Sequence, residues 1–89
     1  MYTQNDYKIL KHILKKNDPE KGLIKSKGTT VVEIVESTGL SDRKVRVALK
    51  NFMQDEMICY GVSIGRTKTY CLLKKGLEEI KSLKTSIIE

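Results

Sequence analysis

The stretch LSDRKVRVALKNFMQ, residues 40–54, decides the fold of this 89-residue chain. Ser41 is a favourable N-cap, because its hydroxyl can accept a hydrogen bond from a backbone N–H two or three residues further on. Apolar residues then recur at helical spacing on one side: Val45, Ala48, Leu49 and Phe52. The other side carries Arg43, Arg46, Val47, Lys50, Asn51 and Gln54. The pattern predicts a helix that buries one face and presents a cationic one.

The exposed side of this helix has the side chains that read base pairs. Arginine recognises guanine, asparagine or glutamine recognises adenine, a small apolar group contacts the thymine methyl, and lysine binds phosphate. The alternative is an ordinary solvated helix face. We predict that the helix contacts double-stranded DNA through Ser41, Arg43, Lys44, Arg46, Val47, Lys50 and Asn51.

The distribution of charge supports the DNA interpretation. The chain has a formal net charge of +6. Residues 40–75 contain eight basic and three acidic residues, a net of +5, whereas the rest contains nine basic and eight acidic residues. A cationic excess concentrated in one segment is expected where a polyanion binds.

The preceding residues predict two more helices. Residues 3–16 form the first, with Thr3 as N-cap, and residues 17–28 form a polar connector. A second helix begins at Thr30, where Glu33 completes a capping box, and ends at Gly39. The short turn from there to Ser41 completes a helix-turn-helix.

After residue 56 the apolar period changes from 3.6 to 2, which predicts a β-hairpin. Residues 58–64 form the first strand, residues 65–66 a two-residue type II′ turn, and residues 67–72 the return strand. Cations at the tip suit a wing that lies along the DNA backbone or enters the minor groove. The predicted wing contacts are Arg66, Thr67 and Lys68.

The register of this hairpin stays open at the level of sequence. A two-residue turn pairs Ile64 with Thr67 and Tyr60 with Cys71, whereas a three-residue loop places Cys59 opposite Cys71. The two cysteines are expected to be reduced, packed thiols, with redox sensing as the alternative if they face each other. They are too few for a zinc ribbon, so no metal or other cofactor is expected.

Residues 74–88 predict a C-terminal helix with apolar residues along its length. We interpret it as a dimerisation helix; the alternative is that its first turns pack on the chain's own domain. The predicted dimerisation residues are Leu77, Ile80, Leu83 and Ile87.

Catalysis and membrane insertion find no support in the sequence. No Gly-rich phosphate loop, nucleophile and base pair, or metal-ligand cluster is recognisable, so an enzyme is not expected. No apolar run approaches the roughly 18 residues of a membrane span, and Met1 leads directly into polar sequence without a signal peptide. We expect one cytoplasmic domain over residues 1–89.

The order of elements resembles a winged helix-turn-helix of the α+β class. VRVALKNF (residues 45–52) resembles the recognition helix of GntR-type and MarR-type regulators, and YCLLKKGLEEI (residues 70–80) resembles the exit from the MarR wing. IGRTKTYCLLKKGLEEI (residues 64–80) looks like TubR-type partition proteins. That resemblance implies a small basic homodimer that coats iterated centromere sites, hands the complex to a tubulin-like GTPase and can repress its own operon. It implies major-groove contacts from Arg43, Lys44, Arg46, Val47 and Lys50, with Arg66 and Lys68 serving the wing.

Three functional hypotheses follow. The first is a dimeric, sequence-specific DNA-binding adaptor of a partition system. The second is a small dimeric repressor on a single palindromic operator. The third is a winged helix used as a protein-interaction module, for which the basic face would be dispensable.

Overall fold

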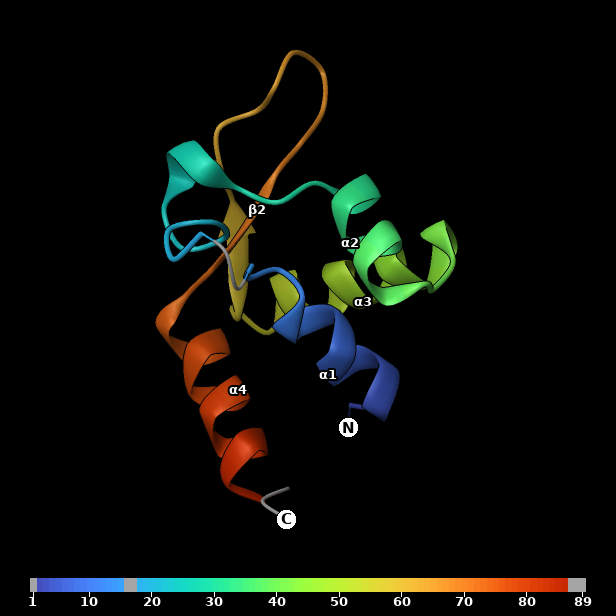
Figure 1. Cartoon of the computed structure of the whole chain (residues 1–89), viewed down its shortest axis with the longest axis vertical. Helices are drawn as coiled ribbons and strands as arrows, with labels where there is room; N and C mark the ends of the chain where they lie inside the picture. Colours follow the sequence, from blue (N-terminus) through green and yellow to red (C-terminus); the bar gives the residue numbers. More distant parts are fainter. Residues whose placement is uncertain (1, 16–17, 87–89) are drawn as a thin grey trace.

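The computed structural model describes residues 2–15 and 18–86, with side chains through residue 82. The elements are α1 (Gln4–Lys11), η1 (Lys25–Lys27), α2 (Val31–Thr38), α3 (Asp42–Gln54), β1 (Ile58–Tyr60), β2 (Tyr70–Leu72) and α4 (Lys74–Ser86). The loop between the two antiparallel strands projects from one end of the molecule, and α4 extends to the other (Figure 1). This order confirms the predicted winged helix-turn-helix.

The core is built around the buried face of α3. Its four predicted apolar residues are all at most 2% exposed, and Phe52 is completely buried. The ring of Tyr2 packs on Phe52 with centroids 5.2 Å apart. The remaining core side chains come from α1, α2, both strands and α4, and from Ile13 after α1 and Met57 before β1. Because the other elements pack against the buried face of α3, its exposed face is held in one orientation.

Local capping fixes the two helices of the helix-turn-helix as predicted. Thr30 accepts a hydrogen bond from the Glu33 N–H (3.2 Å), and the Glu33 carboxylate accepts one from the Thr30 N–H (3.0 Å). Gly39 ends α2 in the left-handed conformation, at φ 73°. The Ser41 hydroxyl accepts from the Lys44 N–H at 3.1 Å and starts α3. These caps set the turn between α2 and α3.

The first helix is shorter than predicted. Thr3 caps it, but α1 ends at Lys11 rather than at residue 16. The carbonyl of Ile13 accepts a hydrogen bond from the buried Thr29 hydroxyl at 2.6 Å. The backbone beyond α1 is thus bound by Thr29, just before α2, a contact that helical periodicity does not report.

The wing contains one pair from each of the two registers that the sequence left open. Cys59 lies opposite Cys71 at the base, while Ile64 pairs with Thr67 at the tip, so the pairing of Tyr60 with Cys71 was wrong. The first strand therefore has one extra residue between base and tip, as in a β-bulge. The Val62 N–H turns away to the Lys25 carbonyl (2.8 Å), which also explains why β1 ends at residue 60 instead of 64, and β2 begins only at residue 70.

The turn that leads from α3 into the wing is compact. The Met57 N–H donates to the Phe52 carbonyl (2.9 Å) and the Glu56 N–H donates to the Met53 carbonyl (3.2 Å), the two bonds of a Schellman motif. Glu56 occupies its left-handed position, at φ 60°, where glycine is usual. The chain thus enters β1 directly, which places the wing beside α3.

The C-terminal helix packs on the chain itself over its first turns. Ile80 is 4% exposed within the core, Leu77 packs against that core, and the Tyr7 hydroxyl of α1 donates to Glu79 at 3.1 Å. The side chain of Leu83 and all of Ile87 lie outside the described residues. Dimerisation through α4 stays a prediction, but Leu77 and Ile80 already have partners inside the chain.

Candidate nucleic-acid interface

The exposed face of α3 is divided into a central line and two flanks. Arg43, Val47, Lys50 and Gln54 follow one another at helical spacing along the centre, and Val47 is 54% exposed. Arg46 lies on the flank beside the wing. The helix therefore presents a cationic line with one apolar contact, and Gln54 extends the residues predicted to read DNA.

The other flank faces the start of α1. Lys44 and Asn51 line a hollow of about 650 Å³ between α1 and α3, together with Asn5. The hydroxyl of Ser41 is occupied as the helix cap. The seven predicted residues of α3 thus divide into one cap, a central line, a wing-side flank and an α1-side flank.

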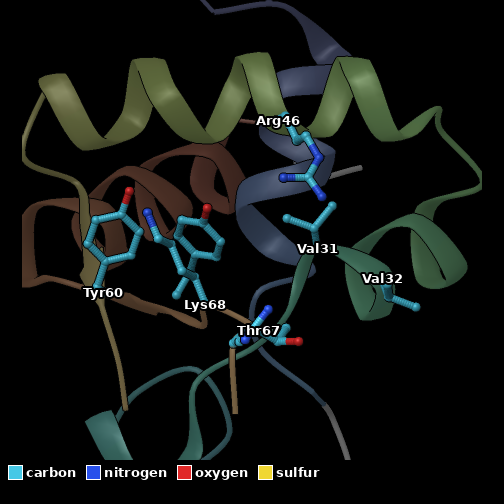
Figure 2. A pocket seen from close by; sticks show the side chains of 8 residues that line it. Val31, Val32, Arg46, Tyr60, Thr67 and Lys68 are labelled. Atoms are coloured by element: carbon cyan, nitrogen blue, oxygen red, sulfur yellow. The ribbon is translucent and has the colours of Figure 1, made fainter. Parts of the chain in front are cut away.

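The wing brings its predicted residues to α3. Arg66, Thr67 and Lys68 are all exposed, and with Arg46 they line a cleft of about 460 Å³ between α3, the wing and the start of α2. Figure 2 shows Arg46 reaching from α3 toward Val31, with Thr67 and Lys68 across the cleft. The structure brings the wing cations and α3 to one surface.

Two tyrosines that sequence reasoning did not select lie at the junction of α3 and the wing. The register places Tyr60 opposite Tyr70, with ring centroids 5.4 Å apart. Burial raises the pKa of the Tyr70 hydroxyl, the neighbouring Tyr60 adds to the rise and Arg46 opposes it. The Tyr70 hydroxyl therefore stays protonated at neutral pH. The two residues share a face only in the observed register, so only a correct register could have identified them.

Ion pairs hold three lysines that precede α2 but only one cation of α3 and the wing. Lys15 and Lys21 pair with Glu33, and Lys27 pairs with Asp18 and Glu20, at 3.0–3.3 Å. On α3, Arg46 is bound by Asp42 at 2.6 Å. Within the described part of the chain, the following cations have no acidic partner: Arg43, Lys44, Lys50, Arg66 and Lys68. Five of the six cations on α3 and the wing therefore carry uncompensated charge.

Other chemistries have little basis in the described residues. Among the described residues, 2–15 and 18–86, no group of three or more metal-binding side chains is present. No helix among them is long and apolar enough to cross a membrane. Cys59 and Cys71 are free thiols. Burial raises the pKa of Cys71, and its Sγ lies 3.2 Å from the Ile24 carbonyl, which disfavours the reactive thiolate.

Comparison with known proteins places this geometry in a class. No protein-family model matches the chain, and no curated protein matches it. Several solved structures do match the chain, and they are winged-helix DNA-binding regulators rather than enzymes. MepR, a transcription regulator of the Staphylococcus aureus multidrug efflux pump MepA, superposes with a TM-score of 0.74 and 17% identity over 94% of this chain. The chain spans 56% of the MepR chain.

Two TubR structures are also similar. The DNA-binding TubR fragment from Clostridium botulinum has a TM-score of 0.70 and 29% identity, over 93% of this chain and 98% of the fragment. TubR from Bacillus thuringiensis serovar israelensis, bound to 24 bp of tubC, has a TM-score of 0.71 and 22% identity, over 91% and 80% of the two chains. The resemblance to TubR-type proteins, and more loosely to MarR-type regulators, is confirmed.

Proposed function

We propose that this protein binds double-stranded DNA sequence-specifically, with α3 in the major groove and the wing on the backbone. The observation that carries the proposal is that five of the six cations on α3 and the wing have no acidic partner among the described residues. A cluster of unpaired cations on one surface attracts a polyanion such as DNA. In this arrangement Arg43, Lys44 and Val47 read bases, and Lys50, Arg66 and Lys68 bind phosphates.

We further propose that the protein acts in the cytoplasm as the homodimeric adaptor of a tubulin-type DNA partition system. The 29% identity to a TubR fragment over nearly its whole length supports this role more than the 17% identity to MepR supports another. A tubulin-like GTPase would be the partner of the protein–DNA complex. Repression of its own operon is compatible with the same DNA site.

The first test is enrichment of DNA by the purified protein. Sheared DNA from the source strain is incubated with it at about 0.15 M salt, where non-specific phosphate binding is weak, and the retained DNA is sequenced. A cluster of closely spaced repeats supports the partition adaptor. A single palindrome upstream of a gene supports the repressor instead, and no enrichment refutes sequence-specific binding and favours a protein-interaction module.

Two variants test the division of labour on the enriched site. Arg43→Ala should relax the preference at one base pair, at a cost of about 1–3 kcal/mol, because a base contact is lost. Lys68→Gln should weaken binding to all sequences alike, because a phosphate contact is lost. Identical effects of the two variants would refute the assignment.

A further inference from the structure

The groove between α3 and the wing consists of two hollows that meet at three residues. One is the cleft described above, and the other, of about 510 Å³, is lined by Lys50 and Gln54 among others. Both are lined by Arg46, Tyr60 and Tyr70. The two rings therefore form a ridge between the two hollows on the wing side of α3.

We propose that this ridge is a phosphate seat, in which Tyr60 is a DNA-contacting residue. The Tyr60 hydroxyl donates a hydrogen bond to one phosphate of the DNA backbone, and the ring of Tyr60 positions Lys68 to bind the same phosphate. Arg46 contributes from α3. The inference rests on the proposed DNA-binding function and assigns a specific backbone contact within it.

The cleft has the charge and size for a phosphate. Its lining contains three cations, Arg46, Arg66 and Lys68, and no acidic residue. Its volume of about 460 Å³ corresponds to about fifteen water molecules, at roughly 30 Å³ each, so a phosphate fits with part of its hydration shell. Asp42 lies outside the lining and holds only the Nε of Arg46, so the terminal guanidinium nitrogens stay available.

Lys68 is held in place without being neutralised. Its Nζ lies 5.0 Å from the centroid of the Tyr60 ring, a cation–π contact, and it has no acidic partner among the described residues. Figure 2 shows Lys68 beside the Tyr60 ring, with the Tyr60 hydroxyl directed toward α3. A lysine that is already oriented loses less side-chain entropy when it binds an anion. Tyr60 thus prepares a cation for binding while leaving its charge uncompensated.

The exposure of Tyr60 supports a role outside the core. The residue is 48% exposed, although its ring packs on that of Tyr70 at an interplanar angle of 42°. Tyrosine combines a rigid ring with a hydroxyl donor, which suits a contact that is apolar at one end and hydrogen-bonded at the other. Val31 and Val32, in the first turn of α2, close the far side of the cleft, where the helix dipole is positive.

The experiment measures duplex affinity against salt concentration, on the enriched site and on an unrelated 24 bp duplex. Tyr60→Phe removes only the hydroxyl and should weaken binding about 3- to 10-fold without changing the salt slope, as expected for one hydrogen bond. Lys68→Gln should reduce the slope by about 0.9 per bound chain. Tyr60→Leu should weaken binding more than Tyr60→Phe, because Lys68 loses its ring. The matched controls are Tyr7→Phe and Lys11→Gln on α1, which should leave both the affinity and the slope unchanged.

A second measurement does not depend on duplex binding. Inorganic phosphate is titrated into the free protein while the ring signals of Tyr60 are followed by NMR, and a saturable shift that is lost in Lys68→Gln supports the seat. A DNA seat saturates only above about 1 mM, because a single phosphate lacks the neighbouring contacts; saturation well below 1 mM would overturn the DNA assignment in favour of a free phosphate ligand.

The outcomes separate the two proposals. Wild-type binding with Tyr60→Phe and Lys68→Gln indistinguishable from their controls overturns the seat and the phosphate contact of Lys68, and leaves DNA binding by α3 standing. Loss of all duplex binding with a saturable phosphate shift refutes the function and retains a phosphate seat. Absence of both duplex binding and the phosphate shift refutes both proposals.

Discussion

The ion pair at the start of α3 offers a direct test of which surface meets DNA. The Asp42 carboxylate lies 2.6 Å from the Arg46 Nε, and both side chains are well exposed, at 58% and 63%. Asp42→Asn removes the one acidic partner found among the α3 and wing cations of the described residues. If α3 faces DNA, this change should strengthen binding.

The magnitude follows from counterion release. Freeing Arg46 adds one effective cation per chain, which steepens the slope of log K against log salt by about 0.9. Relative to 1 M salt, that slope corresponds to about five-fold tighter binding at about 0.15 M. The side chains are too exposed for the lost pair to matter much for folding.

Fluorescence anisotropy with a labelled duplex, repeated at several salt concentrations, measures this slope. Glu20→Gln is the matched control, because Glu20 is equally exposed, at 58%, and pairs with Lys27 (3.2 Å) in the connector. It should leave the slope unchanged. Equal steepening by both variants would show that net charge rather than position governs binding, and no steepening by Asp42→Asn would refute the placement of Arg46 at the DNA.

Three further predictions concern stability and are checked by urea denaturation. Glu56→Gly should raise the free energy of unfolding by about 0.5–1 kcal/mol, because Glu56 is at φ 60° and glycine adopts that conformation without strain; unchanged stability would contradict this. Gly61→Ala should lower it by about 1–3 kcal/mol, since a Cβ would lie 2.6 Å from the Oγ1 of the buried Thr69; a neutral result would mean that the wing yields easily. Burial of Glu33 raises its pKa, but the Thr30 N–H and two lysines outweigh burial and leave the pKa lowered. The contribution of the Glu33 carboxylate to folding stability is therefore present above about pH 5 and is lost as pH falls through the lowered pKa. Glu33→Gln should therefore lose stability at pH 7 and flatten the acid limb, and an unchanged acid limb would contradict it.

Much of the fold follows from short-range patterns in the sequence. The cap at Ser41 and the apolar spacing that ends at Phe52 predict the bounds and buried face of α3 correctly, because a cap and a 3.6-residue period act within a few turns. The capping box at Thr30 and the left-handed Gly39 are equally local. The exposed cations of α3 follow from the same period, since what is not buried faces outward.

Contacts between distant segments decided the rest. The end of α1 depends on the bond from Thr29 to Ile13, and the bulge of the wing depends on the bond from Val62 to Lys25, both between residues far apart in the chain. The bulge shifts the register by one residue and so brings Tyr60 opposite Tyr70.

The sequence by itself therefore determined the order of helices and hairpin, and which residues of α3 face outward. Only the tertiary structure decided which cations stay unpaired and which side chains meet between α3 and the wing. The physical reason is range: capping and periodicity are properties of neighbouring residues, whereas ion pairing and strand register depend on which distant segments the folded chain brings into contact.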